Sequence, residues 1–267
     1  MQSESPVMLI TGASSGIGLA TARLFSQQGY RLVLAARRME RLLSLTDEIQ
    51  QSGGQALPVQ ADVSRLDQVQ SLVQQALERF GQIDVLLNNA GIGRLDWLER
   101  LDAVEEIEPQ LQVNLWGAIQ MTRAILPHMI ARRSGHIILM NSLAGLIAPP
   151  TYSVYAASKY GLRGFTEALR REVGVWGIHV TGIYPGAVDT EFTEHAGIHR
   201  RTGVTTPRLL RLSAQQVAQA VFRTVQRPSK SIFLPTVMRP VVWLNACLPG
   251  VLDWAMERWF VRREREL

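Results

Sequence analysis

The alternation of short apolar runs with longer amphipathic segments limits most strongly the folds open to this chain. Six apolar runs are typical of buried strands, and they cover residues 7–10, 31–36, 56–62, 83–90, 135–142 and 178–186. Apolar residues recur every three or four positions, as in amphipathic helices, in the segments 18–29, 39–53, 66–81 and 168–177. Apolar strands that alternate with helices form parallel sheets covered on both faces. The pattern predicts an α/β protein with a doubly wound, Rossmann-like fold.

Residues that cap or end helices and strands refine this prediction. The chain has 267 residues and no Pro-, Gly- or Ser-rich linker, so we expect one domain over residues 1–267. Ser64 is expected to cap the helix that Gly81 ends, and Ser213 to cap a further helix over 214–226. The segment 231–235 is expected to add one more strand.

Composition argues against several kinds of partner and location. The net charge is +5, but acidic residues are interspersed with the arginines, so no nucleic acid is expected. The single cysteine, Cys247, excludes an internal disulfide, and the sequence predicts no metal site. The start of the chain does not resemble a secretion signal. The apolar stretch 240–252 is shorter than the ~20 residues that span a bilayer, so a cytoplasmic location is expected.

The stretch TGASSGIG, residues 11–18, lies between the first strand and the first helix. Its glycines, Gly12, Gly16 and Gly18, permit a tight turn and a close approach of the backbone to a ligand. The backbone N–H groups of such a turn and the N-terminus of the helix favour phosphate. The loop therefore predicts a nucleotide site, with a tight turn that binds nothing as the alternative.

The end of the second strand indicates which nucleotide is bound. A carboxylate there would favour NAD by binding the ribose hydroxyl, but this chain has Arg37 and Arg38 instead. Arginine suits a 2′-phosphate, so NADP(H) is expected rather than NAD(H). The alternative is a pair of exposed arginines that leads into the next helix.

Tyr155 and Lys159 are four residues apart and hence lie on one face of a helix. A tyrosine has a reference pKa of about 10 and is a poor acid or base at neutral pH. We expect the neighbouring ammonium to favour the phenolate and to lower that pKa toward a catalytically useful range.

Taken in order, these segments resemble the short-chain dehydrogenase/reductase family. The resemblance rests on TGASSGIG, ADV (61–63), NNAG (88–91), QVNLWG with Asn114, MNSLAG with Ser142, the Tyr155/Lys159 pair and YPGAVDT (184–190). It covers most of the chain, includes the unusual glycine spacing and matches the family's tetrad without departure. The resemblance and the arginine pair together imply that the cofactor contacts Gly12, Ser14, Ser15, Gly16, Ile17, Gly18, Arg37, Arg38, Asp62, Val63, Asn89, Ala90, Gly91, Tyr155, Lys159, Pro185, Gly186, Val188 and Thr190.

The resemblance also implies catalytic roles for the tetrad. Tyr155 would donate a proton to a carbonyl oxygen while the nicotinamide delivers a hydride to the carbon. Ser142 would hydrogen-bond that oxygen. Lys159 would lower the pKa of the tyrosine and bind the ribose hydroxyls. Asn114 would hold a water that relays protons to Lys159.

The last third of the chain concerns the substrate. The resemblance implies that residues from about 190 to 212 form a lid over it. The basic residues of this lid fit either a solvated loop or an anionic substrate, and they are His195, His199, Arg200, Arg201, Arg208 and Arg211. Residues from about 236 to 267 form an apolar and basic extension that holds three of the six tryptophans. This extension could pack on a second subunit, line the entrance for an apolar substrate, or touch a membrane surface.

The sequence thus predicts an NADP(H)-dependent oxidoreductase that interconverts a carbonyl and an alcohol, on a hydrophobic or lipid-like small molecule. NADPH as cofactor favours reduction as the working direction. A homodimer or homotetramer is expected, with peripheral membrane contact as one option. The alternatives are a non-catalytic NADP(H)-sensing scaffold, and a lyase or epimerase on the same fold.

Overall fold

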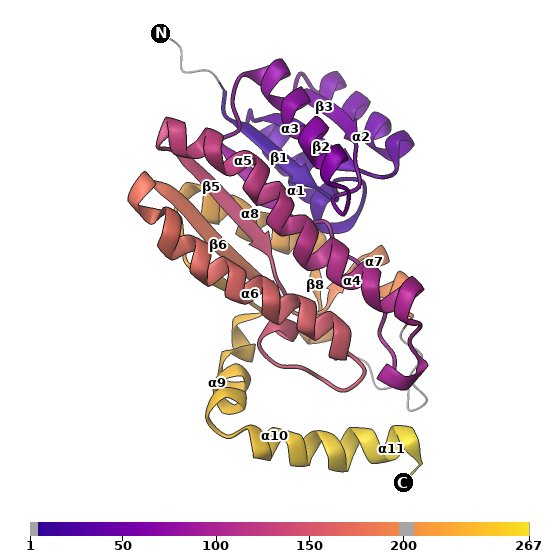
Figure 1. Ribbon diagram of the computed structural model, residues 1–267. Coiled ribbons are helices and arrows are strands. Elements are labelled where there is room, and N and C mark those ends of the chain that lie inside the picture. Colours follow the sequence, from indigo (N-terminus) through magenta and orange to yellow (C-terminus); the bar gives the residue numbers. More distant parts are fainter. Residues whose placement is uncertain (1–4, 198–205, 267) are drawn as a thin grey trace.

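Seven parallel strands form one sheet through the centre of the protein, as the computed structural model shows for residues 5–197 and 206–266 (Figure 1). Their order across the sheet is β3-β2-β1-β4-β5-β6-β9. The strands are β1 (Val7–Thr11), β2 (Arg31–Ala36), β3 (Gln55–Gln60), β4 (Val85–Asn88), β5 (Gly135–Met140), β6 (Ile178–Pro185) and β9 (Ser231–Leu234). The predicted fold class is confirmed, and the segment 231–235 does supply the additional strand.

Helices cover both faces of the sheet. One layer holds α1 (Gly16–Gln27), α2 (Met39–Gln51) and α8 (Ala214–Gln226), and the other holds α3 (Leu66–Phe80), α5 (Ala118–Arg132) and α6 (Ser153–Val173). Strand β1 serves both layers, because successive side chains of a strand point to opposite faces. Val7 and Leu9 therefore pack in one apolar core, whereas Met8 and Ile10 pack in the other.

Two of the three predicted helix boundaries are correct. Gly81 ends α3 in the left-handed conformation, with a φ of 72°. Ser213 caps α8 as predicted, since its hydroxyl accepts a hydrogen bond from the backbone N–H of Gln216. The cap assigned to Ser64 is wrong. Its hydroxyl donates to the carboxylate of Asp62 at 2.7 Å, and α3 begins two residues later with no side-chain cap.

The sequence pattern did not indicate the helical segment that precedes and includes α5. It runs through two π-helical stretches, Ala103–Ile107 and Gln112–Gly117, with α4 (Glu108–Leu111) between them. Polar side chains occupy interior positions there, including Gln110, Asn114, Gln120 and Thr122. These buried polar residues interrupt the apolar period on which the prediction of helices depends.

A second small sheet holds the two ends of the segment predicted as a lid. Strand β7 (Val188–Asp189) pairs in parallel with β8 (Leu212–Ser213), so that Val188 lies opposite Leu212. Between these strands, α7 (Glu191–His195) directly follows Thr190. The segment predicted as a lid therefore begins shortly after β6 and ends just before α8.

The chain ends in a helical arm. After a short turn (Thr236–Met238) come α9 (Arg239–Cys247), α10 (Pro249–Met256), a π-helical stretch (Glu257–Val261) and α11 (Arg262–Arg265). We call residues 249–265 the C-terminal arm. In Figure 1 the arm, drawn in yellow, lies below the body, at the end of the molecule toward which the arrow of β5 points. Among the described residues, no helix is both long and apolar enough to cross a membrane.

Candidate active site

The crevice at the carboxyl ends of β1 and β4 is where the topology of this sheet places a ligand. The chain continues from β1 to β2 on one side, whereas β4 lies on the other side of β1. Open α/β sheets bind ligands at such a switch point, because the loops that follow the two strands diverge and leave a crevice. The glycine loop follows β1, and the residues Asn89, Ala90 and Gly91 follow β4.

The glycine loop approaches its neighbours too closely for larger residues. Gly12 has a φ of +67°, and a Cβ atom there would lie 2.9 Å from the Cα of Ala90. A Cβ atom on Gly18 would collide with the carbonyl oxygen of Gly12. The loop consequently lies tight against the end of β4 and against the first turn of α1, which begins at Gly16.

Hydrogen bonds hold this loop to the end of β4. The hydroxyl of Thr11 accepts bonds from the backbone N–H groups of Asn89 and Ala90, each at 3.0 Å. The side-chain amide of Asn89 donates in return to the carbonyl oxygens of Thr11 and Gly12. The contacts fix the two segments relative to each other, so that Asn89 and Ala90 support the loop.

The two arginines after β2 have different surroundings. Arg38 donates hydrogen bonds to the hydroxyls of Ser14 and Ser15 in the glycine loop, at 3.1 and 2.9 Å. Arg37 points elsewhere, because its guanidinium lies 4.0 Å from the carboxylate of Asp62 and its side chain is 66% exposed. Arg37 and Asp62 share a hollow with Gln60, Ala61 and Gln68. Val63, beside them, is buried.

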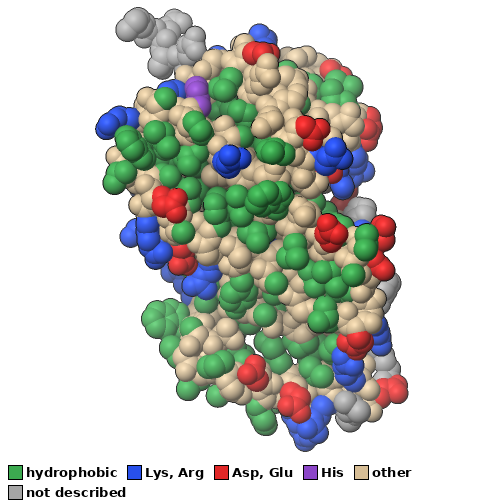
Figure 2. Space-filling model, in the orientation of Figure 1, with side chains coloured by type: hydrophobic (Ala, Val, Ile, Leu, Met, Phe, Trp, Pro, Cys, Tyr) green, Lys and Arg blue, Asp and Glu red, His purple; other side chains and the backbone are tan. Residues whose placement is uncertain are grey.

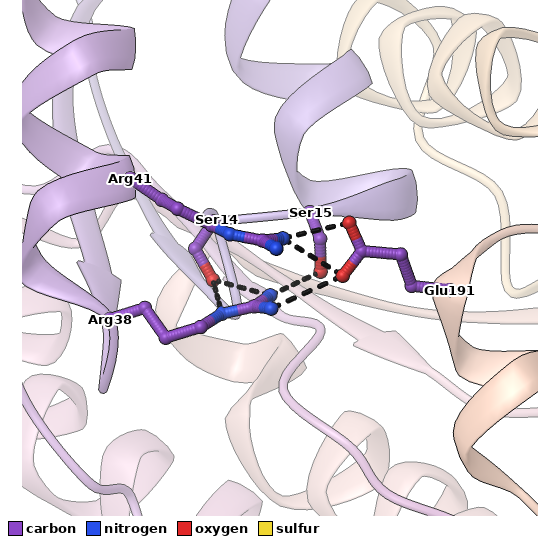
Figure 3. A network of polar contacts seen from close by, with 5 residues as sticks. All are labelled: Ser14, Ser15, Arg38, Arg41 and Glu191. Atoms are coloured by element: carbon purple, nitrogen blue, oxygen red, sulfur yellow. Dashed lines mark hydrogen bonds and ion pairs between the residues drawn. The ribbon is translucent and has the colours of Figure 1, made fainter.

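Two further residues join Arg38, and the sequence reasoning missed both. Arg41 and Arg38 both contact the carboxylate of Glu191, which begins α7 (Figure 3). Arg41 follows Arg38 by three positions at the start of α2, and this spacing was a signal that the two could act together. Glu191 gave no such signal, because it is 150 residues away in the sequence.

These features fit a dinucleotide cofactor. The turn before α1 and the N-terminus of this helix at Gly16 supply backbone N–H groups of the kind that bind a pyrophosphate. The guanidinium of Arg38 and the hydroxyls of Ser14 and Ser15 supply further donors beside this turn. Ile17 lies in the first turn of α1, next to these donors.

Tyr155, Ser142 and Lys159 meet at the carboxyl end of β5. Ser142 follows this strand and caps a short turn, where its hydroxyl accepts a hydrogen bond from the N–H of Ala144. Tyr155 and Lys159 lie in the first two turns of α6, and the ammonium is 5.7 Å from the centre of the tyrosine ring. The ammonium donates to the carbonyl oxygen of Met140 at 2.9 Å. The predicted pair therefore does share a helix face.

The pKa values of this pair correct one sequence-based expectation. Burial raises the pKa of Tyr155 to about 12, against which a hydrogen bond with Ser142 acts only in part. Burial also lowers the pKa of Lys159 to about 8. We expected the lysine to lower the pKa of the tyrosine, but in this arrangement burial disfavours the charged form of each group. Tyr155 thus keeps its proton at neutral pH.

Asn114 lies in the π-helical stretch before α5 and is fully buried. Its side-chain oxygen accepts a bond from the N–H of Ile92 at 2.8 Å. Its side-chain amide donates to the carbonyl of Ile92 and to the hydroxyl of Ser158. Both amide hydrogens are therefore already used. Its oxygen lies 3.2 Å from where a Cβ on Gly91 would be, so Asn114 does lie beside the end of β4.

Apolar side chains surround the phenol of Tyr155. The ring of Phe192, from α7, lies 5.6 Å from the ring of Tyr155, and the ring of Tyr152 lies 6.2 Å away. Leu95, Ala144 and Ala196 complete the cluster. The backbone N–H of Leu95 donates to the carbonyl of Ala196, which joins the loop after β4 to the end of α7. The helix α7 thus packs directly on the tyrosine and contributes to its apolar surroundings.

The remaining predicted cofactor residues lie at the end of β6 and beyond. Pro185 ends the strand, and Gly186 donates to the carbonyl of Leu234 in the neighbouring β9. Val188 lies in β7. Thr190 lies against Gly16, since a Cβ atom on Gly16 would be 3.2 Å from the methyl group of Thr190. Of the basic lid residues, His199, Arg200 and Arg201 lie outside the described residues.

Comparison with known proteins agrees with this geometry. A family model described as short chain dehydrogenase matches residues 6–200. The uncharacterized oxidoreductase YxnA of Bacillus subtilis is 34% identical over 259 residues, which are 96% of this chain and 72% of that protein.

Two solved structures resemble this one over most of its length. One is an alcohol dehydrogenase from Thermococcus sibiricus complexed with 5-hydroxy-NADP, with a TM-score of 0.77, 30% identity and coverage of 86% of this chain and 96% of that one. The other is a short chain dehydrogenase/reductase from Burkholderia phymatum in complex with NAD, with a TM-score of 0.82, 27% identity and coverage of 92% and 94%. Such neighbours support a nicotinamide cofactor. One of the two holds a derivative of NADP and the other holds NAD.

Proposed function

Because this chain belongs to the short-chain dehydrogenase family, we propose that it is an NADP(H)-dependent oxidoreductase that interconverts a carbonyl and an alcohol. The buried phenol of Tyr155 carries this proposal. It lies beside Ser142 and Lys159 at the carboxyl end of the sheet, on the side where the glycine loop lies. A general acid must stand next to the site at which the cofactor reacts.

The raised pKa of Tyr155 supports reduction as the working direction. In reduction the tyrosine has to donate a proton, and a phenol with a pKa of about 12 is protonated at neutral pH. Ser142 would donate a hydrogen bond to the substrate oxygen and stabilise the developing negative charge. The bound nicotinamide would supply the hydride. Lys159, with a pKa of about 8, would carry a positive charge near neutral pH and bind the ribose hydroxyls.

Preference for NADP(H) over NAD(H) is supported by Arg38. Its guanidinium bonds two hydroxyls of the glycine loop and so lies beside the phosphate-binding turn. A guanidinium and two hydroxyls suit a phosphate monoester better than a bare ribose hydroxyl. Arg37 would contribute from the neighbouring hollow that it shares with Asp62.

We further propose an apolar substrate and a lid over residues 190–212. Leu95 and Phe192 surround the phenol with carbon atoms, which favours a hydrophobic ketone or aldehyde over a highly charged one. The C-terminal arm would bound the entrance. Its first helix is preceded by Asn245, which donates to the carbonyl of Leu146, and its end reaches Trp97.

A homo-oligomer remains our expectation for the assembly. The face that carries α4, α5 and α6 shows a band of apolar side chains in Figure 2. Val104, Leu111 and Trp116 are exposed on the helical segment before α5. Exposed apolar side chains gathered on one face are typical of contacts between subunits.

Replacing Tyr155 by Phe tests the catalytic proposal. The variant removes only the hydroxyl, so we expect turnover with NADPH and an apolar ketone to fall by about a thousandfold, the order of magnitude that a general acid contributes. NADPH binding, measured by fluorescence titration, should stay within about twofold, because the phenol does not form the phosphate site.

Tyr160→Phe provides the matched control. Tyr160 lies on the same helix, next to Lys159, but its side chain is exposed. This variant should turn over like the unaltered protein. Equal activity of Tyr155→Phe and Tyr160→Phe would rule out Tyr155 as the acid. Product formation without net consumption of NADPH would instead favour a lyase or epimerase.

A further inference from the structure

The carboxylate of Glu191 lies against Arg38 and Arg41, beside the glycine loop. One of its carboxylate oxygens lies 3.1 Å from the guanidinium of Arg38, and both oxygens lie within 2.8 Å of a single nitrogen of Arg41. Arg38 at the same time donates to the hydroxyls of Ser14 and Ser15 (Figure 3). A carboxylate from a distant segment of the chain is therefore bound by two guanidinium groups beside the glycine loop.

The donors around this carboxylate also suit a phosphate group. Two guanidinium groups and two hydroxyls bind a phosphate monoester dianion through charge-assisted hydrogen bonds, as they bind a carboxylate. A phosphate monoester carries more negative charge than a carboxylate and has three terminal oxygens. It would therefore bind the same donors more strongly than Glu191 does.

The position of Glu191 in the chain couples this site to the lid. The residue begins α7, directly after Thr190, which lies against Gly16 of the glycine loop. The next residue, Phe192, lies against the ring of Tyr155. Binding of Glu191 by the arginines consequently fixes the start of α7 between the cofactor loop and the catalytic tyrosine.

Building on the proposed NADP(H) dependence, we propose that Glu191 is an internal competitor for the adenosine 2′-phosphate, and that Arg41 is a second ligand for this phosphate beside Arg38. The 2′-phosphate would displace the carboxylate from both arginines and release the start of α7. NAD(H) has no group that could displace Glu191, so the competition would act on the phosphorylated cofactor alone.

The exposure and charge of the network permit such an exchange. The side chains of Arg38, Arg41 and Glu191 are 38%, 43% and 38% exposed, so water and ligand reach them. Arg41 and then Arg38 hold the pKa of Glu191 below its ordinary value, so the carboxylate is charged at neutral pH. Partly exposed ion pairs have small free energies, and a dianion can replace them.

Two nucleotides that differ only in the 2′-phosphate test this proposal without turnover. The full chain is titrated calorimetrically with adenosine 2′,5′-bisphosphate. Glu191→Gln should bind this nucleotide about fivefold more tightly than the unaltered protein does, because breaking a partly exposed arginine–carboxylate pair changes an affinity by about that factor. Binding of 5′-AMP should be equal in both. In the Glu191→Gln background, Arg41→Gln should then weaken bisphosphate binding, because no internal carboxylate remains to be displaced.

Glu48→Gln is the matched control variant. Glu48 forms an ion pair of 2.7 Å with Arg23, its side chain is similarly exposed, and the substitution removes the same charge. It should leave the affinity for both nucleotides unchanged. An equal gain in bisphosphate affinity in Glu48→Gln and Glu191→Gln would show that the gain comes from the net charge of the protein. Competition by Glu191 would then be excluded.

Hydrogen exchange in α7 gives a second readout. In the unaltered protein, adenosine 2′,5′-bisphosphate should speed exchange of the amides of residues 191–196, whereas 5′-AMP should not. In Glu191→Gln neither nucleotide should change it. If the bisphosphate binds better than 5′-AMP but Glu191→Gln binds it no better, competition is excluded and the NADP(H) preference stands. If the unaltered protein and Glu191→Gln both bind the two nucleotides equally, the NADP(H) preference itself is excluded.

Discussion

Single buried residues in this protein owe their proton affinities to loss of contact with water. Burial raises the pKa of Tyr155 and lowers that of Lys159, since each group is harder to charge inside the protein. His136 in β5 follows the same rule. Burial, with a smaller effect of the neighbouring His179, lowers the pKa of His136 to about 4, and its ring lies 2.9 Å from the hydroxyl of Thr181.

His136 should make the stability of the fold depend on pH. The unfolded chain takes up a proton on this residue below about pH 6.5, whereas the folded chain does so only below about pH 4. The unfolded state thus binds more protons in between, and the free energy of unfolding falls as the pH falls through this window, by about 3 kcal/mol for this group.

Urea unfolding between pH 7 and pH 4 measures this contribution. In His136→Gln the titrating group is absent, so the free energy of unfolding should fall less steeply between pH 6.5 and pH 4 than in the unaltered protein. The comparison uses the slope and tolerates a lower starting stability of the variant. Parallel curves for the two proteins would show that the pKa of His136 is the same in the folded and unfolded states.

At the scale of elements, side chains at helix ends decide where helices begin. Both Ser64 and Ser213 precede amphipathic segments, but only Ser213 forms a cap. Its hydroxyl accepts from the N–H of Gln216, and the side chain of Gln216 accepts from the N–H of Ser213. The hydroxyl of Ser64 is instead bound by Asp62, which also accepts from the N–H of Ser64. A neighbouring carboxylate therefore decided the outcome.

Loss of the cap should destabilise α8 and the small sheet of β7 and β8 that lies beside its start. Ser213→Ala removes both the acceptor for the N–H of Gln216 and half of the capping box, so we expect the free energy of unfolding in urea to fall by about 1 kcal/mol. Ser44→Ala is the control, because Ser44 is exposed in the middle of α2, where alanine favours the helix. A loss of similar size in both variants would mean that the cap contributes nothing particular.

At the scale of the whole molecule, the C-terminal arm joins two loops that follow different strands. Val242, just before the arm, packs with Leu143 and Leu146 after β5. At the other end, the guanidinium of Arg265 lies 3.9 Å from the ring centre of Trp97 and 2.8 Å from the carboxylate of Glu99. Figure 2 shows openings between the arm and the body with apolar side chains around them. The far end of the arm is thus held to the loop after β4, whereas α9, which precedes the arm, is held to the loop after β5.

Releasing the far end of the arm should affect large substrates and spare small ones. Arg265→Ala removes the contact with Trp97 and the exposed ion pair with Glu99. We expect the KM for a bulky apolar ketone to rise about threefold, the order that an exposed cation–π contact and a weak surface ion pair contribute, while the KM for a small ketone stays the same. The measurement is initial-rate kinetics at saturating NADPH.

Arg262→Ala is the control for the arm, because Arg262 pairs with Glu257 within the arm itself. It should leave both KM values unchanged. Equal KM values of the bulky ketone for Arg265→Ala and Arg262→Ala would contradict a role in bounding the entrance. A change in oligomeric state or in binding to lipid vesicles on loss of Arg265 would favour the other two interpretations of this segment.

The sequence determined the sheet and the segments that form the site. Period, apolar runs and turn residues predicted the seven strands of the main sheet, the helices α1, α2, α3 and α8, and the end of α6, because burial repeats regularly along regular structure. The glycine spacing, the arginines after β2 and the Tyr155/Lys159 interval are local patterns, and the structure places them at the same end of the sheet. The buried polar residues around Asn114 broke the pattern, and the helix there was missed.

The neighbours of these segments follow from contacts between elements that are distant in the sequence. The contact of Glu191 with Arg38 and Arg41, the packing of Phe192 on Tyr155 and the reach of Arg265 to Trp97 each join residues far apart in the sequence. The direction in which the pKa of Tyr155 shifts also depended on burial among several elements, which outweighs the hydrogen bond with Ser142. Contacts of this kind leave no period or spacing in the chain, because they arise only when separate elements pack together.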